Sequence, residues 1–468
     1  MSLYQELIPF FEPKSIAVVG ASEKLGTLGR GLMLNLLEKF RGKIYPVNIK
    51  YDRVFGLTCY KSVKEIPGEV DLAVIAIPAR AVINVAKDCC DKGIKALLII
   101  SAGFKEIGPE GAEREKRLVE IARSCNMRIV GPNCLGIYDA HTGLDTIYNP
   151  SDRQGKPKPG NVAFISQSGA LGAAMLDWLA GSGVGLSRFI SYGNAADVDE
   201  TDLIEFLVED PKTKIISAYI EGVKDGRRFM NAIRKAVKAG KPVVILKAGK
   251  TMRGIKAVTS HTGSLAGKYE IYEAALKQSG ALIVNELWEL VPLLKALSWL
   301  PIPRGNRLAI VTNGGGAGIL ATDATEKLGL IMTNLNSETI EKLKKSLPPH
   351  ASPYNPVDII GDATAERYEK ALEIVCQDEN VDMIVIIALM QSPTLDADKL
   401  RKVLIEFKKK VDKPVVFVAP GGDYTEKHSR AIEQEAKIPV FKSPEEAIRA
   451  LKYLVIWKER YERIIKES

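Results

Sequence analysis

Short apolar runs alternate with helical segments along almost the whole chain. Many of these runs are continuously apolar, as in 71–78 (DLAVIAIP) and 383–389 (MIVIIAL). Continuous runs of this length indicate strands buried on both faces, which is typical of a parallel sheet covered by helices. A spacing of roughly 30 residues between strands is that of βαβ units. We expect strands at 15–20, 43–48, 71–78, 96–104, 127–133, 162–169, 186–193, 214–222, 242–249, 281–287, 308–316, 330–334, 383–389, 414–420 and 439–443.

Two polar stretches rich in proline divide this pattern into three blocks. They are 148–161 (YNPSDRQGKPKPGN) and 300–307 (LPIPRGNR), and both are typical of connections between domains. The sequence therefore predicts an α/β fold of three consecutive domains with mostly parallel sheets, at 1–148, 149–301 and 302–468.

The first strand of the first block runs into a glycine-rich turn. Gly20, Gly26 and Gly29 would let backbone N–H groups reach a phosphate at a helix N-terminus, and Ser22 and Thr27 could add hydroxyl donors. Such a turn can equally be a simple packing turn of a Rossmann-like fold.

The end of the second strand favours one class of nucleotide over another. NAD sites usually place a carboxylate there, whereas this chain has Asn48, Ile49 and Lys50. A lysine at this point favours a ligand with an additional phosphate. Coenzyme A fits better than NAD, and NADP stays open.

Ligands in open parallel sheets bind beyond the carboxyl ends of the strands. The other strand ends of the first block should therefore line the same crevice. Cys134 could lie near a thiol ligand or be a buried structural residue. The further candidates for the cofactor site are Ile77, Pro78, Ser101, Gly103, Asn133 and Cys134.

The second block begins with another turn of this type, at 165–172 (ISQSGALG). Ser168 and Gly169 would lie at a helix N-terminus, where the helix dipole favours an anion. The turn could hold a phosphate or be an ordinary helix cap.

His261 lies between two hydroxyl residues and is followed by an expected helix (SHTGSLAGKYEIYEAAL). We expect it in a loop, where an imidazole near a phosphate-binding turn suggests nucleophilic catalysis through phosphohistidine. Such a histidine needs an acceptor on its other nitrogen. The candidate is Glu221, with Asp225 as a second choice; Glu221 could also be a solvated loop carboxylate.

The loop SYGNAADVD (191–199) offers Gly193, Asn194 and Asp197 as groups that face a ligand. The carboxylates that follow, Glu200, Asp202 and Glu205, suggest a solvated helix start rather than a metal site.

The third block has a third turn of the same type, VTNGGGAG (311–318). Gly314, Gly315 and Gly316 lead into a helix and would present its N-terminus to an anion. A packing loop is the alternative, and 352–364 has no chemical identity of its own.

Composition limits the function classes. Lys and Arg (65) exceed Asp and Glu (57) by 8, with no long basic tract, so small anionic ligands are favoured over nucleic acid. The six cysteines include no C-x-x-C pair, and the four histidines are too scattered for zinc. No apolar run approaches a membrane span and the N-terminus lacks signal-peptide features, so we expect reduced thiols, no metal and a cytoplasmic protein.

The ordered set GASxxxG, IPAR, SAGF, GPNCLG, ISQSGALG, YGNAADVD, IEG, SHTGSLAG and NGGGAG resembles the NDP-forming acyl-CoA synthetases, relatives of succinyl-CoA synthetase, over essentially the whole chain. The resemblance implies a Rossmann-like CoA-binding domain followed by two flavodoxin-like ligase domains. It also implies the reaction acyl-CoA + ADP + phosphate ⇌ acid + CoA + ATP.

The resemblance also implies roles for the candidates. His261 would take the phosphoryl group, oriented by Glu221 and held between the helix N-termini at Ser168–Gly169 and Gly314–Gly316, while the YGNAAD loop would handle the carboxylate substrate. ADP or ATP with Mg²⁺ would bind an ATP-grasp domain on a separate beta subunit, in an α2β2 assembly.

Two other functions stay open on sequence alone. They are a CoA-binding regulatory protein without catalysis and an NADP-dependent oxidoreductase.

Overall fold

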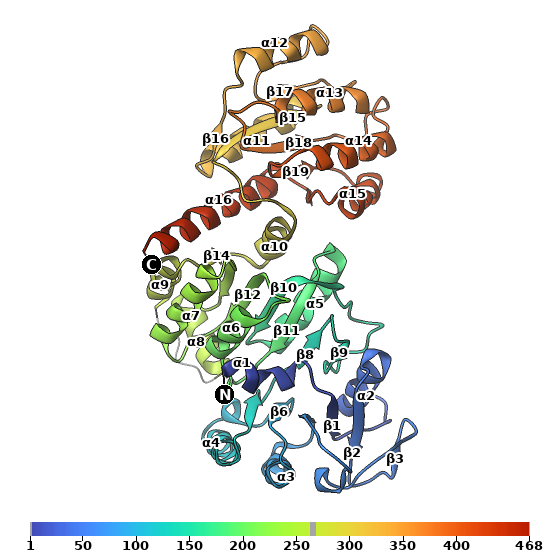
Figure 1. Cartoon of the computed structure of the whole chain (residues 1–468), viewed down its shortest axis with the longest axis vertical. Coiled ribbons are helices and arrows are strands. Elements are labelled where there is room, and N and C mark those ends of the chain that lie inside the picture. Colours follow the sequence, from blue (N-terminus) through green and yellow to red (C-terminus); the bar gives the residue numbers. More distant parts are fainter. Residues whose placement is uncertain (1, 263–267, 468) are drawn as a thin grey trace. The chain divides into compact units, whose positions relative to one another are not determined.

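The structure is a computed structural model that describes residues 2–262 and 268–467 (Figure 1). Its contacts form two compact units, Met1–Asn285 with Ile464–Ser468, and Glu286–Arg463. The first unit contains two large sheets and the second contains one. In the described ranges no helix combines the length and the apolar character needed to cross a membrane.

The first sheet is entirely parallel, in the order β2-β1-β5-β6-β7. Alternate residues of β1 point to opposite faces, and Ala17 and Val19 belong to the core on the face that α3 and α4 cover. The elements are β1 (Ser15–Val19), α2 (Leu28–Lys39), β2 (Lys43–Val47), β5 (Leu72–Ile75), α3 (Ala79–Lys92), β6 (Ala96–Ile99), α4 (Pro109–Ser124) and β7 (Arg128–Val130), with α1 (Leu3–Leu7) before them and the hairpin β3 (Arg53–Val54) and β4 (Leu57–Thr58) after β2.

The second sheet has the order β14-β13-β12-β10-β11-β8-β9, and its five strands from β14 to β11 are parallel. Strands β8 and β9 add an antiparallel edge. The elements are β8 (Ile137–Asp139), β9 (Leu144–Asp145), β10 (Pro159–Ser166), α5 (Gly169–Ser182), β11 (Leu186–Ser191), α6 (Glu200–Glu209), β12 (Ile215–Ile220), α7 (Gly226–Lys238), β13 (Val243–Lys247), α8 (Met252–Thr262), α9 (Tyr269–Ser279) and β14 (Leu282–Val284).

The third sheet is parallel, in the order β16-β15-β18-β19-β20, with β17 also paired to β15. Ala309 and Val311 face one core, and Leu308 and Ile310 face the other. The elements are α10 (Leu290–Trp299), β15 (Arg307–Thr312), α11 (Gly315–Lys327), β16 (Ile331–Met332), α12 (Ser337–Ser346), β17 (Val357–Asp358), α13 (Ala365–Cys376), β18 (Met383–Ile387), α14 (Ala397–Lys410), β19 (Val415–Val418), α15 (Asp423–Ala436), β20 (Val440–Phe441) and α16 (Pro444–Lys466).

The predicted fold class is confirmed: the chain is α/β, and its sheets are mostly parallel. Each expected apolar run contains a strand, and most of these strands are buried on both faces; β16 and the start of β2 are exceptions. The pattern missed the short strands β3, β4, β8, β9 and β17. Since β8 and β9 pair in the second sheet, that sheet begins before residue 148; the domain boundaries themselves stay a prediction.

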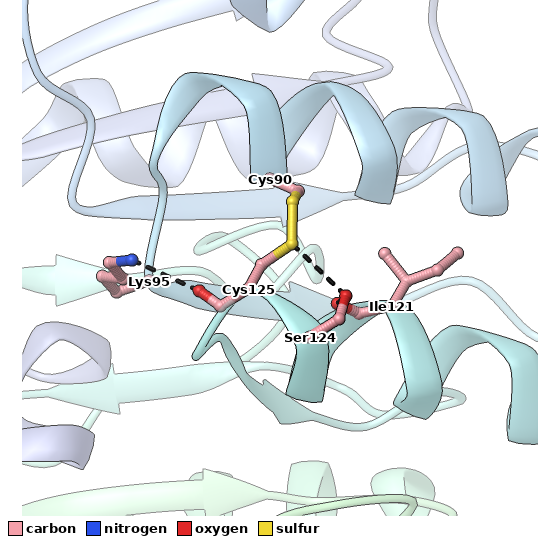
Figure 2. The surroundings of a disulfide bond; sticks show 5 residues. All are labelled: Cys90, Lys95, Ile121, Ser124 and Cys125. Atoms are coloured by element: carbon pink, nitrogen blue, oxygen red, sulfur yellow. Dashed lines mark hydrogen bonds between the residues drawn. A yellow bond between two sulfur atoms is a disulfide. The ribbon is translucent and has the colours of Figure 1, made fainter.

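The expectation that all six cysteines are reduced thiols is wrong for two of them. Cys90 and Cys125 form a disulfide, with their Cα atoms 5.7 Å apart (Figure 2). Cys90 lies in the last turns of α3, and Cys125 caps the C-terminus of α4, which packs beside α3. A spacing rule cannot detect this pair, because helix packing joins residues that are 35 positions apart.

We predict that reduction of this disulfide lowers the free energy of unfolding of the first domain by about 3–4 kcal/mol, because the unfolded chain gains the freedom of a long loop. Denaturant unfolding with and without a reductant measures the change. In a Cys90→Ala/Cys125→Ala variant the reductant should have no effect. Equal stability of the oxidised and reduced wild type would contradict the prediction.

Candidate active site

In each of the three large sheets one interior strand, β1, β10 or β15, ends in a turn that leads into a helix. The next two main strands along the chain lie on opposite sides of this strand, so the strand order reverses there. This is where open α/β sheets form their ligand crevices. The three predicted turns lie at these three points.

The first turn requires glycine at positions 20 and 29. Gly20 has φ +97°, and a Cβ there would lie 2.4 Å from the carbonyl oxygen of Ala76. A Cβ on Gly29, in the first turn of α2, would lie 1.9 Å from the carbonyl oxygen of Gly20. The start of α2 therefore packs directly on the turn, with Thr27 as its N-cap. Gly26 has φ +77°, and its surroundings leave open space.

The residue that follows β2, Asn48, is hydrogen-bonded to this turn. The Asn48 side-chain amide donates to the carbonyl oxygen of Ala21 (2.8 Å), and its Oδ1 accepts the N–H of Lys50 (2.9 Å). Lys50 is exposed, while Ser22 is buried and accepts the N–H of Lys24. A cation thus lies beside a glycine turn, which suits an anionic nucleotide.

The remaining candidates of the first block lie at the same end of the sheet. The Ser101 hydroxyl donates to the carbonyl oxygen of Ile77 (2.6 Å) and accepts its N–H (3.1 Å). Pro78 begins α3, and Gly103 has φ +106°. The N–H of Asn133 donates to the carbonyl oxygen of Ser101 (2.9 Å).

Cys134 has no exposed thiol at this end of the sheet. Its side chain is buried, its Sγ lies 3.3 Å from the carbonyl oxygen of Ile99, and burial raises the pKa of the thiol to about 12. A thiol with this pKa stays protonated, so these contacts favour the structural interpretation.

The second turn connects a helix N-terminus to a carboxylate on the next strand. Ser168 is the N-cap of α5 and accepts the N–H of Leu171, and Gly169 is the first helical residue. Between β10 and this cap, Gln167 Oε1 accepts the N–H of Glu221 (2.8 Å), directly after β12. One amide side chain therefore fixes Glu221 relative to the start of α5.

Glu221 is only 3% exposed, so its interpretation as a solvated loop carboxylate is wrong. The Tyr219 hydroxyl donates to its Oε1 (3.4 Å), and the Lys247 ammonium donates to its carbonyl oxygen (2.8 Å). Burial lowers the pKa of Lys247 to about 8, against the opposing effect of Glu221.

The backbone at His261 is helical, since α8 runs to Thr262, so the expected loop at this residue is wrong. The hydroxyl-rich sequence does not break the helix. The side chain of His261 lies outside the described residues. Asp225, the second choice as its partner, accepts the N–H of Arg228 as the N-cap of α7.

In the loop 191–199, which we predicted to face the substrate, Asn194 and Asp197 bind other residues of the chain. Asn194 donates to Glu106 (2.6 Å) and Glu115 (2.9 Å). Asp197 accepts from Arg128 Nε (2.8 Å) and from the N–H of Ile129 (2.9 Å).

Gly193 has φ +54°, and a Cβ there would lie 2.3 Å from the carbonyl oxygen of Asn133. With the contacts of Asn194 and Asp197, this packing holds the loop against the first sheet; a role with substrate stays a prediction for all three residues.

The start of α6 is not the solvated helix start that we expected. Glu200 and Asp202 are 2% and 5% exposed. Asp202 pairs with Arg128 (3.0 Å) and Arg228, and Arg228 also pairs with Glu205 (2.6 Å). Burial raises the pKa of Glu200 to about 7. The charge pattern alone could not predict that Arg128, a residue of the first sheet, pairs with Asp202 at the start of this helix.

The third turn repeats the second with one difference. Thr312 Oγ1 donates to the carbonyl oxygen of Gly314 (3.0 Å), as Ser166 Oγ does to that of Ser168 (2.7 Å). Asn313 Oδ1 accepts the N–H of Leu389 (2.8 Å). Leu389 has the same place after β18 that Glu221 has after β12.

A Cβ on Gly314 would lie 2.5 Å from Leu389. Gly315 starts α11, and Gly316 has open space around it. This turn thus has no carboxylate at the position of Glu221, but the carboxylate of Asp358, at the end of β17, lies beside Gly315.

Sequence reasoning missed Gln167 and Lys247. The signal for Gln167 was its place inside ISQSGALG, and that for Lys247 was a lysine ending the apolar run PVVILK.

Three family models match the chain in order. They are the CoA binding domain (residues 14–140), the succinyl-CoA ligase like flavodoxin domain (159–297) and the ligase-CoA domain (308–459). Together with the three turns, this combination defines a ligase of the CoA-dependent class.

Curated relatives match over nearly the whole chain. The alpha subunit of acetate–CoA ligase (ADP-forming) II of Pyrococcus furiosus is 45% identical over 95% of this chain and 96% of its own length. Acetate–CoA ligase (ADP-forming) I of Archaeoglobus fulgidus is 43% identical over 95% of this chain, which spans 62% of that protein. The chain belongs to the family of ADP-forming acetate–CoA ligases.

A solved structure has the same fold. The dinucleotide-forming acetyl-coenzyme A synthetase 1 of Ca. Korarchaeum cryptofilum, in complex with phosphate and ADP, superposes with a TM-score of 0.92 at 37% identity, covering 98% of both chains.

We predict that Asp197→Asn lowers the free energy of unfolding by about 3 kcal/mol, because Arg128 loses a carboxylate in a largely buried site. Denaturant unfolding measures it. Asp52→Asn, at an exposed ion pair with Lys61, is the control and should change stability by less than about 1 kcal/mol. Unchanged stability of the Asp197 variant, with a raised KM for the acid, would favour the substrate role instead.

Proposed function

We propose that this chain is the alpha subunit of an ADP-forming acyl-CoA ligase that works through a phosphohistidine at His261. The reaction is acyl-CoA + ADP + phosphate ⇌ acid + CoA + ATP. The observation that carries the proposal is the second turn. There the start of α5 and the buried carboxylate of Glu221 are fixed to each other through Gln167, within the flavodoxin domain that contains His261.

Coenzyme A would bind at the end of the first sheet. The glycine turn after β1 has open space around Gly26 for close approach of a ligand, and Lys50 offers an exposed cation for the 3′-phosphate. A phosphate oxygen would attack the thioester carbonyl carbon, and the C–S bond would break with release of the CoA thiolate. The product is an acyl phosphate.

The phosphoryl group would then pass to the histidine. A ring nitrogen of His261 attacks the phosphorus atom, and the acid leaves as its carboxylate. The phosphoryl group next passes to ADP, which restores the histidine. Glu221 would accept a hydrogen bond from the N–H of the other ring nitrogen and thereby keep the attacking nitrogen unprotonated.

Helix N-termini would stabilise the phosphoryl group. The start of α5 at Ser168–Gly169 and that of α11 at Gly314–Gly316 each present unpaired N–H groups, each contributing about 0.3–2 kcal/mol. Phosphoryl transfer depends mainly on such positioned charge.

We propose that ADP and Mg²⁺ bind an ATP-grasp domain on a separate beta subunit, in a cytoplasmic α2β2 assembly. Two comparisons with relatives support a separate partner subunit. The Pyrococcus relatives are named as alpha subunits, and this chain spans only part of the Archaeoglobus ligase. The acid is small in this proposal, as acetate is for these relatives.

The proposal predicts that His261→Ala abolishes ATP formation from acetyl-CoA, ADP and phosphate, because the phosphoryl carrier is lost. The assay uses the chain assembled with a candidate ATP-grasp subunit. The control is His141→Ala, which removes an exposed imidazole bonded to the carbonyl oxygen of Gly160 and should leave the rate unchanged. Turnover by the His261 variant would refute the mechanism. CoA binding by a wild-type assembly that never turns over would favour the non-catalytic CoA-binding alternative.

The CoA site gives a second prediction. Lys50→Met should weaken binding of CoA by about 5–10-fold, since one exposed cation–phosphate contact is worth about 1 kcal/mol. It should leave binding of 3′-dephospho-CoA unchanged. Lys61→Met is the matched control, because Lys61 is already paired with Asp52 (2.7 Å). Calorimetric titration measures both ligands, and an equal loss for both would place Lys50 away from the 3′-phosphate.

A further inference from the structure

Lys247, the last residue of β13, is a lysine with almost no exposure (1%). Its ammonium donates to the carbonyl oxygen of Glu221 (2.8 Å) and to that of Ala248. It also lies over the ring of Tyr272, 4.5 Å from the ring centroid. The ammonium therefore contacts the end of β12, the residue that follows β13, and the first turn of α9.

Tyr272 extends this contact. Its hydroxyl accepts the N–H of Val223 (3.3 Å), two residues after Glu221. The chain leaves the sheet at Ala248 and forms α8, which includes the backbone of His261, and α9 begins at Tyr269. Lys247 and Tyr272 thus join the end of β13 and the first turn of α9 to the strand end that presents Glu221.

A second lysine–tyrosine pair lies one helical turn away. Lys250 Nζ is 5.6 Å from the ring centroid of Tyr269 and 3.3 Å from Asn285 Oδ1. Tyr269 and Tyr272 are three residues apart in α9 and so lie on one face of the helix. Lys247 ends β13 and Lys250 lies three residues after it, so both lysines join the chain at the end of β13 to the start of α9.

We propose that Lys247 is a positioning residue for the phosphoryl transfer of the proposed function, on which this inference rests. Its ammonium fixes the backbone at Glu221 and supplies a positive charge beside that carboxylate and the arriving phosphoryl group. An aromatic ring face can stabilise a desolvated ammonium without neutralising it, so the charge is retained at this buried position.

Lys241, at the opposite end of β13, shows what a purely structural lysine looks like here. Its ammonium donates to three carbonyl oxygens, those of Leu207 (2.8 Å), Val208 (2.7 Å) and Asp210 (2.8 Å), and these close the end of α6. It lies at the amino ends of the strands, away from the turns. A Lys241→Met variant is therefore a matched control for the loss of a hydrogen-bonded lysine.

The charge of Lys247 has a defined pH range. Glu221 from the end of β12 is the charged group that acts on it, and Tyr272 from α9 is the titratable group in contact. Burial lowers the pKa of the lysine to about 8. The ammonium is present below this pH and is lost as the pH rises through it.

The experiment measures the rate at which ATP phosphorylates His261 in the assembly with the beta subunit, from pH 6 to 9.5. This half-reaction does not involve the CoA thiol. In the wild type we expect the rate to fall above about pH 8. Lys247→Met should be about 100-fold slower below pH 8 and should lack this alkaline fall. Lys247→Arg should retain much of the rate and keep it at alkaline pH, because guanidinium stays charged.

The control variant Lys241→Met should lower thermal stability while keeping the wild-type pH profile. The KM for CoA should be unchanged in all three variants, because none touches the first sheet. If Lys247→Met does not fold, Tyr272→Leu replaces it. Loss of the ring should move the alkaline fall to lower pH, whereas Tyr272→Phe, which keeps the ring, should not move it.

The two proposals fail separately. A wild-type assembly that forms no phosphohistidine overturns the proposed function, and this inference with it. A wild type that is phosphorylated, with Lys247→Met or Tyr272→Leu giving the same rate and pH profile, overturns the role of Lys247 alone.

Discussion

The order of the strands determines where this chain can bind ligands. In each of the three large sheets one interior parallel strand has its sequence neighbours on opposite sides, so the connections diverge at the carboxyl end, where such sheets form their ligand crevices. Both faces of every sheet are covered by helices, which leaves these ends as the accessible part of the strands. The glycine, serine and asparagine residues of the three turns lie there because the backbone must turn sharply into a helix.

The turns after β10 and β15 are held by equivalent hydrogen bonds but have different residues at the neighbouring strand end. In both, a hydroxyl on the last strand residue bonds the turn, and an amide side chain reaches the end of the neighbouring strand. The second sheet presents Glu221 at that strand end, and the third presents Leu389. A carboxylate at this strand end suits a titrating partner such as imidazole. In the third sheet the carboxylate beside the turn is Asp358, which comes from β17 on the other side of β15.

The sequence predicted the architecture well, because strands that are buried on both faces appear in the sequence as continuous apolar runs. Short antiparallel strands such as β8 and β9 carry no such run and were missed. Turn glycines were found because a positive φ demands them, as at Gly20. The partners of Asn194, Asp202 and Cys90 could not be predicted, since each lies on an element distant in sequence. The strand end made Glu221 a candidate, but the contact of Lys247 with it became visible only when β12, β13 and α9 were placed together.

The most direct test of this account is the identity of the phosphorylated residue. The chain, assembled with its ATP-grasp partner, is incubated with acetyl-CoA, phosphate and Mg²⁺, and the acid-labile, base-stable phosphate is mapped by mass spectrometry. The account predicts one phosphopeptide, modified at His261, with much less of it in a Glu221→Gln variant. Phosphate on any other residue, or the same amount without the carboxylate, would contradict it.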